Sequence, residues 1–166
     1  MSVRSFFTRK DALPQRLTGT VWGILVVLSV TGSVSVVAHG QESTGTLFLA
    51  GLGALAAWSI VETGMAFFEG LLVSVGAPAR RSGLERAALM TGVVLFVGAL
   101  PILVPLVALA PWPTWALRVS NAVAILELFF VGLLAGRVAG GRPLVWGLSL
   151  VAFGGALVAV IVLLGG

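Results

Sequence analysis

The sequence predicts an all-α fold, an integral membrane bundle of five transmembrane helices that forms a single domain over residues 1–166. Apolar residues make up 58% of the chain and charged residues only 10%, which is far from the composition of soluble domains. The mean hydropathy of +1.12 agrees with this class. Short polar segments divide the chain into five apolar runs, and each run is long enough to cross a bilayer.

The first two predicted spans lie on either side of a short polar turn. We expect the first at about residues 18–38, where an apolar run follows the polar N-terminal segment, and the second at about 46–75. A run as long as the second exceeds the thickness of the hydrocarbon. This helix should therefore tilt, or extend its Glu69 end into water.

The other three spans are expected at about 87–109, 114–136 and 143–165. Pro101 and Pro105 should kink the third span and free the backbone carbonyls of Val97 and Pro101. Freed carbonyls are potential cation ligands, and they are equally what a kinked packing helix contains. Glycine-rich pairs such as Gly19-xxx-Gly23 and Gly132-xxx-Gly136 indicate close helix contact, either within a tight bundle or in a dimer.

The orientation in the bilayer follows from the basic residues, which concentrate at the cytoplasmic ends of membrane helices. Nine of the ten lie on one side of the predicted spans and only one on the other. The nine are Arg4, Arg9, Lys10, Arg16, Arg80, Arg81, Arg86, Arg137 and Arg142, and the tenth is Arg118. We therefore expect a cytoplasmic N-terminus and, after five crossings, a C-terminus outside. The expected location is the inner membrane of a prokaryotic cell.

Composition and motifs argue against several classes of function. The basic residues are scattered over loops and build no basic face with interleaved aromatic residues, so nucleic acid is not an expected partner. The chain has no cysteine, which excludes disulfides and thiolate metal sites. It also lacks a catalytic constellation of the familiar hydrolase or metalloprotease types. We therefore expect the protein not to be an enzyme, with the lipid bilayer as its main surroundings.

Three of the six acidic residues lie inside predicted spans, where an ionisable group costs between about 3 and more than 10 kcal/mol. Glu62, Met65 and Glu69 follow the spacing i, i+3, i+7 and share one face of the second helix. Carboxylate oxygens with one thioether sulfur suit a first-row cation such as Fe²⁺, Mn²⁺ or Zn²⁺. Two simpler interpretations stay open: Met65 packs against a neighbour, and Glu69 pairs with Arg80 or Arg81.

The third buried acid, Glu127, lies near the middle of the fourth span. It either ties helices together through a hydrogen bond or takes part in an ion or proton path. The sequence does not place it relative to Glu62. The candidate metal-binding residues are therefore Glu62, Met65, Glu69 and Glu127, with no permanently bound cofactor expected.

Several short motifs resemble the vacuolar iron transporter family. Met65-Ala-Phe-Phe-Glu69 is similar to that family's second-span Met-Ala-x-Gly-Glu segment, and Gly98-Ala-Leu-Pro101 to its third-span Gly-Ala-x-x-Pro segment. Leu133-Leu-Ala-Gly-Arg137 and the glycine-rich last span resemble its C-terminal region. The resemblance implies five spans, a homodimer with the ion path between the protomers, and metal-ligating roles for Met65 and Glu69.

The chain departs from that family at two places. Trp22 precedes Gly23 where the family has an aspartate, and residues 76–86 replace the family's acidic metal-binding insert. Two hypotheses follow. The first is a transporter of divalent transition-metal cations, iron (Fe²⁺) or manganese (Mn²⁺), that exports them from the cytosol in exchange for protons. The second is a membrane subunit or scaffold that keeps the five-helix fold, does not transport, and binds heterologous membrane subunits.

Overall fold

The computed structural model describes residues 13–37, 43–73 and 83–164 of the chain. Within them it contains five helices and no strand, which confirms the all-α class. All five are long and apolar enough to cross a membrane. Each coincides with a predicted span to within five residues. They are α2 (Leu13–Val37), α3 (Thr44–Val73), α4 (Leu84–Ala108), α5 (Pro113–Val138) and α6 (Pro143–Leu163).

Local sequence explains where several of these helices begin and end. The Ser43 hydroxyl accepts a hydrogen bond from the Thr46 backbone N–H at 3.1 Å and so caps the first turn of α3. Both α5 and α6 begin at a proline, the residue best suited to the first helical position. At the end of α5, Gly140 adopts a positive φ of 68°, and the Gly141 N–H donates to the Gly136 carbonyl at 2.9 Å. This glycine turn reverses the chain into α6.

The third span continues through both of its prolines, so α4 is helical from Leu84 to Ala108. Val97 and Pro101, whose carbonyls the prolines free, are both exposed on the surface of the bundle. Pro105 is buried. Both prolines are therefore accommodated within one continuous helix.

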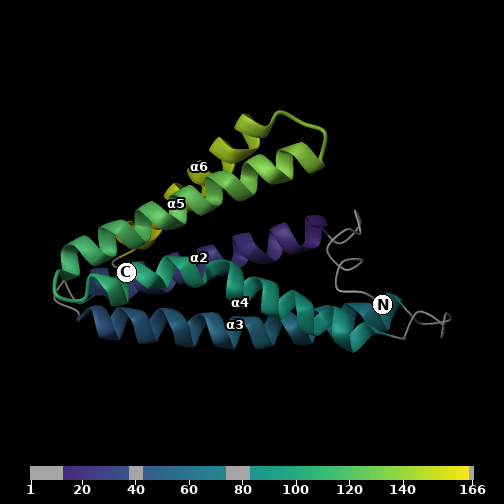
Figure 1. Cartoon of the computed structure of the whole chain (residues 1–166), viewed down its shortest axis with the longest axis horizontal. Helices are drawn as coiled ribbons and strands as arrows, with labels where there is room; N and C mark the ends of the chain where they lie inside the picture. Colours follow the sequence, from purple (N-terminus) through teal and green to yellow (C-terminus); the bar gives the residue numbers. More distant parts are fainter. Residues whose placement is uncertain (1–12, 38–42, 74–82, 165–166) are drawn as a thin grey trace.

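The helices form two groups (Figure 1). In one group α3 packs most extensively on α4, and α2 packs on both; in the other α5 and α6 form an antiparallel hairpin. The hairpin contacts α2 and α4, whereas α3 scarcely reaches it. Figure 1 shows α5 close to α4 where α5 begins and increasingly distant from α2 and α4 toward its end. The start of α2 and the end of α6 lie at opposite ends of the bundle, as five crossings require.

Glycines allow the helices within each group to approach one another closely. A Cβ added at Gly23 would lie 2.7 Å from the Leu95 carbonyl oxygen of α4, and one added at Gly132 would lie 2.6 Å from the Gly147 Cα of α6. Such distances leave no room for a side chain. The two predicted glycine pairs are therefore occupied by contacts inside the chain, between α2 and α4 and between α5 and α6.

The core lies where α2, α3, α4 and α5 meet, and one polar contact crosses it. The buried Ser120 hydroxyl of α5 donates to the Ile102 carbonyl of α4 at 2.6 Å. This bond ties the hairpin to the first group. The largest fully buried apolar side chains are Ile24, Val27, Leu55, Leu95, Ile102, Leu103, Leu106 and Leu128.

We expect Ser120→Ala to destabilise the protein by about 1 kcal/mol, because a buried hydrogen bond is lost. Thermal unfolding in detergent measures this as a lower midpoint. The matched control is Ser149→Ala, since Ser149 is exposed on α6 and should leave the midpoint unchanged. Equal midpoints for the two variants would show that the Ser120 contact contributes nothing to stability.

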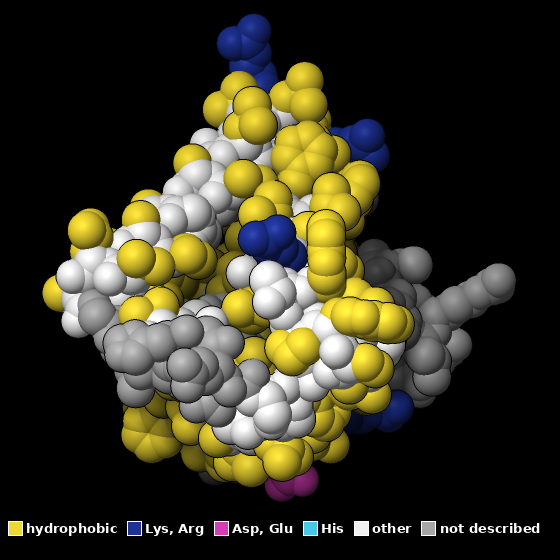
Figure 2. All heavy atoms as spheres, turned by 90° about the vertical axis from the view of Figure 1, so that its left-hand side faces the viewer, with side chains coloured by type: hydrophobic (Ala, Val, Ile, Leu, Met, Phe, Trp, Pro, Cys, Tyr) yellow, Lys and Arg dark blue, Asp and Glu magenta, His cyan; other side chains and the backbone are white. Residues whose placement is uncertain are grey.

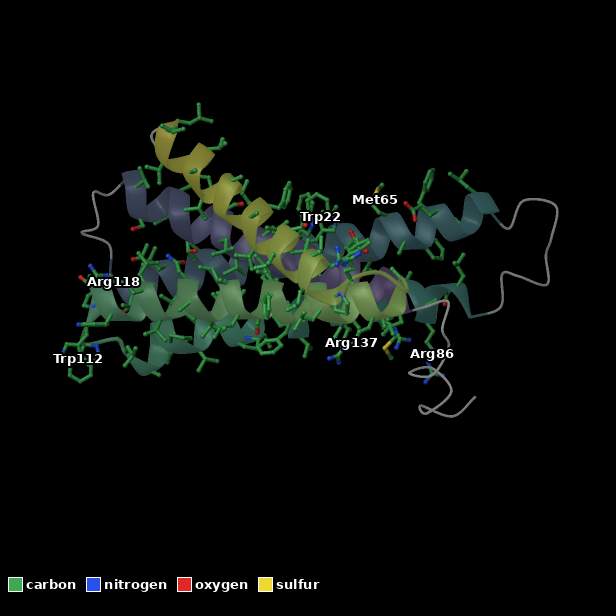
Figure 3. The ribbon with its side chains drawn as sticks, turned by 90° about the horizontal axis from the view of Figure 1, so that it is seen from above. Trp22, Met65, Arg86, Trp112, Arg118 and Arg137 are labelled. Atoms are coloured by element: carbon green, nitrogen blue, oxygen red, sulfur yellow. The ribbon has the colours of Figure 1, made fainter. Side chains whose placement is uncertain are left out.

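Charged side chains lie mainly toward the ends of the bundle. Figure 3 shows Trp112 and Arg118 at one end and Arg86 and Arg137 toward the other, which we call the basic end. Arg118 lies 5.7 Å from the ring centroid of Trp115, a cation–π contact at the end opposite the basic one. Seen from that opposite end, the surface is mostly hydrophobic with few charges (Figure 2). This segregation agrees with a membrane protein; which end faces the cytoplasm stays a prediction.

Candidate functional site

The face of α3 that carries the candidate ligands begins as a buried face. Leu47, Gly51 and Leu55 follow one another at four-residue intervals, and all three are buried. A Cβ added at Gly51 would lie 2.7 Å from a Leu103 side-chain carbon and 3.4 Å from Thr31. In its first half, therefore, this face of α3 is covered by α2 and α4.

The same face continues into the second half of α3, where it is no longer covered. Trp58, Glu62, Met65 and Glu69 follow the spacing i, i+4, i+7, i+11 and share one face with Leu55. Met65 is 54% exposed, Trp58 and Glu69 are exposed, and Glu62 is half-buried. We call these four residues the carboxylate face. Figure 3 shows Met65 projecting from the surface of the bundle on the same side as Trp22.

The neighbouring face of α3 is the one that packs on α4 over this half. A Cβ added at Gly92 would lie 2.5 Å from the Ser59 carbonyl oxygen, and one added at Gly70 would collide with Leu84. The Thr63 hydroxyl also lies where a Cβ of residue 92 would be. It donates a hydrogen bond to the Ser59 carbonyl at 2.8 Å. Helix α4 therefore packs on this adjacent face of α3 and leaves Met65 and Glu69 of the carboxylate face exposed.

The two acids of the carboxylate face have no partner within the described part of the chain. Neither Glu62 nor Glu69 makes a hydrogen bond or ion pair there. The alternative partners of Glu69, Arg80 and Arg81, lie outside the described residues. Glu69 borders a pocket of about 280 Å³ between α3 and α4 that Gly70 also lines.

The spacing of the ligands determines how a cation would be held. Glu62 and Met65 are one helical turn apart and can contact one ion, whereas Glu69 lies about 10 Å from Glu62 along the axis. Among the described residues, no three Asp, Glu, His or Cys side chains come together in a way that would hold a metal ion. Within the described residues, the carboxylate face is therefore a row of acidic and thioether side chains spaced along the helix axis.

An aromatic pair at the end of this row was not predicted from the sequence. The rings of Trp22 on α2 and Trp58 on α3 have centroids 6.4 Å apart and are tilted by 37°. Both side chains are exposed, at 48% and 39%. The spacing of Trp58 four residues before Glu62 was the available signal, but only the structure shows that α2 brings Trp22 beside it.

Glu127 lies on a different helix and a different side of the bundle. It follows Ser120 at i+7, so it continues the face of α5 that packs on α4. Its Oε2 atom is buried and has no hydrogen-bond partner. The structure does not bring Glu127 to Glu62, because α2 and α4 lie between α3 and α5. Among the described residues, no hydrogen bond from the Glu127 side chain ties α5 to another helix.

We expect Glu127→Leu to raise the midpoint of thermal unfolding in detergent. A half-buried carboxyl without a partner costs free energy, of the order of 1–3 kcal/mol, that an apolar side chain of similar size does not. Leu126→Ala, an exposed neighbour on α5, is the control for loss of side-chain bulk on this helix. A lower midpoint for Glu127→Leu would mean that the carboxyl does hold helices together.

Together these features define a helical membrane protein with a partly uncovered row of acidic and thioether side chains on α3. Comparisons with protein-family models, curated proteins and solved structures find no match for this chain. The resemblance to vacuolar iron transporters therefore rests on the short motifs alone.

Proposed function

We propose that this protein transports divalent transition-metal cations, iron or manganese, across the membrane. The observation that carries the proposal is the carboxylate face, whose acids lie within a membrane helix, are half-buried or exposed, and have no partner among the described residues. A carboxylate facing hydrocarbon costs several kcal/mol, so this face must meet water, ions or another polypeptide. An ion path between two copies of the chain would bring water, ions and a second polypeptide to this face.

The order of the ligands along α3 gives the proposed route. Glu69, nearest the basic end, collects the cation, and Glu62 with Met65 holds it deeper in the membrane. Carboxylate oxygens suit Mn²⁺ and the thioether adds affinity for softer ions such as Fe²⁺. A few weak ligands serve transport better than a complete cage, because the ion must also leave.

A homodimer would complete the path. One copy of the chain leaves the carboxylate face open on one side. A twofold axis beside α3 would place the same face of a second copy opposite it and would double the ligands at the level of Glu62 and Met65. The resemblance to vacuolar iron transporters supports this arrangement.

Proton exchange is the proposed coupling, with export of the metal from the cytosol. Glu127 is the candidate proton carrier, since a carboxyl that gains and loses a proton in a separate part of the bundle need not compete with the metal. The buried Glu127 Oε2 atom supports this role, because among the described residues it has no hydrogen bond that would fix the carboxyl group in place.

The test is flux into proteoliposomes that contain the purified protein. We expect Mn²⁺ and Fe²⁺ to enter vesicles faster than in protein-free controls, and an acidic vesicle interior to accelerate entry at least about threefold through proton exchange. Vesicles that carry the correctly folded protein but accumulate neither metal, with or without the gradient, would exclude this function.

A non-transporting scaffold is the second candidate. It is favoured by the exposed aromatic and thioether side chains of Trp22, Trp58 and Met65, which offer a contact surface for another membrane protein. Purification in mild detergent separates the two: a stoichiometric heterologous subunit, with no metal flux after reconstitution, would support the scaffold.

A further inference from the structure

The carboxylate face meets a second polar face at the Trp22–Trp58 pair. On α2, Trp22, Val26, Ser29 and Ser33 follow the spacing i, i+4, i+7, i+11 and share one side of the helix. Ser29 and Ser33 are half-buried, so this side of α2 is also incompletely covered. The Ser29 hydroxyl donates to the Leu25 carbonyl at 2.7 Å, which leaves its oxygen free to accept from water or to ligate a cation.

The two faces together extend along most of the bundle because α2 and α3 are antiparallel (Figure 1). Glu62 and Glu69 lie between the tryptophan pair and the basic end of the bundle. Ser29 and Ser33 lie between the pair and the opposite end. Beyond Trp58 the face of α3 itself is closed by Leu55 and Gly51, both buried. The two indole rings therefore lie between Glu62 and the side of α2 that carries Ser29 and Ser33.

The position of the two tryptophans is unusual for lipid-facing residues. Trp58 lies midway along α3, whereas tryptophans that contact lipid concentrate at the membrane interfaces. An indole N–H also needs an acceptor when it is away from water, and hydrocarbon offers none. No described residue accepts a hydrogen bond from Trp22 or Trp58. Their N–H groups fit a site that water or a passing ion's hydration shell reaches.

We propose that Trp22 and Trp58 form an aromatic gate that closes the ion path in the middle of the membrane. This inference rests on the transport function proposed above. The two tilted rings occupy the route by their bulk, and their π-faces attract a partly dehydrated cation that waits at Glu62. Passage requires the rings to separate, so the pair limits the rate of transport and favours ions that can shed part of their water.

Flux measurements on Trp58→Ala test the gate. We expect the initial rate of Mn²⁺ uptake into proteoliposomes to rise about fivefold, because the constriction is removed. Binding of Mn²⁺ to the detergent-purified variant should change less than about twofold, since Glu62 and Met65 remain. The matched control is Trp112→Ala, a more exposed tryptophan at the far end of the bundle, which should transport like the wild type. An unchanged or lower rate for a folded Trp58→Ala protein would overturn the gate.

The absence of cysteine from the chain allows a second test, which asks whether the ion path runs past these two positions. In the double variant Trp22→Cys with Trp58→Cys, a short bis-methanethiosulfonate reagent forms a disulfide with each thiol, releases methanesulfinate, and so joins α2 to α3 across the gate until a reductant is added. We expect Mn²⁺ uptake to fall at least about tenfold on cross-linking and to return on reduction. Each single variant treated in the same way is the control. Full uptake by the cross-linked protein would overturn the gate.

The same vesicles distinguish failure of the gate from failure of the transport function. If wild-type vesicles take up Mn²⁺ and Glu62→Gln vesicles do not, transport along α3 stands whatever the tryptophan variants do. If the wild type takes up no Mn²⁺, the transport function itself is wrong, and the gate falls with it.

Discussion

Replacement of Glu62 by glutamine is expected to reduce Mn²⁺ uptake into proteoliposomes at least about tenfold, with little change in thermal stability. The substitution keeps the size of the side chain and removes its negative charge. Glu62 is the deeper of the two acids of the carboxylate face, and the other acid, Glu69, lies about 10 Å from it along the helix axis. Without it, a divalent cation beside Met65 would meet only neutral ligands in a medium of low dielectric constant.

Glu85→Gln is the matched control for Glu62→Gln. Glu85 is exposed in the first turn of α4 and lies outside the proposed path, so its loss removes the same charge from the chain without removing a ligand. Uptake by Glu85→Gln should stay within about twofold of the wild type. Equal uptake by Glu62→Gln and Glu85→Gln would remove Glu62 from the mechanism.

The second large effect concerns the fold, since Gly132→Leu is expected to separate α6 from α5. A Cβ at this position would lie 2.6 Å from the Gly147 Cα and 2.7 Å from the Trp146 carbonyl oxygen. Both are backbone atoms, which cannot move aside as a side chain can. We expect a loss of at least about 3 kcal/mol of stability, seen as a large drop in the thermal midpoint or as failure to purify a folded protein.

Gly155→Leu tests the same substitution at a position on α6 where an added Cβ meets nothing within 4 Å. It should purify and unfold like the wild type, because the new side chain projects into detergent or lipid. A folded Gly132→Leu protein as stable as Gly155→Leu would mean that α5 and α6 are not in close contact.

The sequence predicted the five helices well because the bilayer imposes a length and a composition on each of them. The polar residues that interrupt the apolar runs, such as Ser43 and Gly140, also end or cap helices, so the boundaries agree closely. The glycine pairs indicated close contacts without naming the helices involved. Those assignments depend on how the helices cross, which no local pattern encodes.

The candidate site was only partly predictable. Helical spacing placed Glu62, Met65 and Glu69 on one face, and the structure retains that face. Spacing does not show which part of a face is covered, and the change from the buried Leu55 to the exposed Met65 results from where α2 and α4 lie. The separation of Glu127 from Glu62 and the pairing of Trp22 with Trp58 are likewise contacts between helices, so neither follows from one helix alone.

The most direct test of the central claim is the access of water to the carboxylate face inside a membrane. Glu62→Cys and Ile60→Cys place single thiols two residues apart on α3, at nearly the same depth but on opposite sides of the helix. A membrane-impermeant thiol reagent applied to the basic end of the protein in liposomes measures their exposure. We predict labelling of Glu62→Cys at least about tenfold faster than of Ile60→Cys, which faces lipid. Equally slow labelling of both thiols would show that the carboxylate face is dry, and would contradict an ion path along α3.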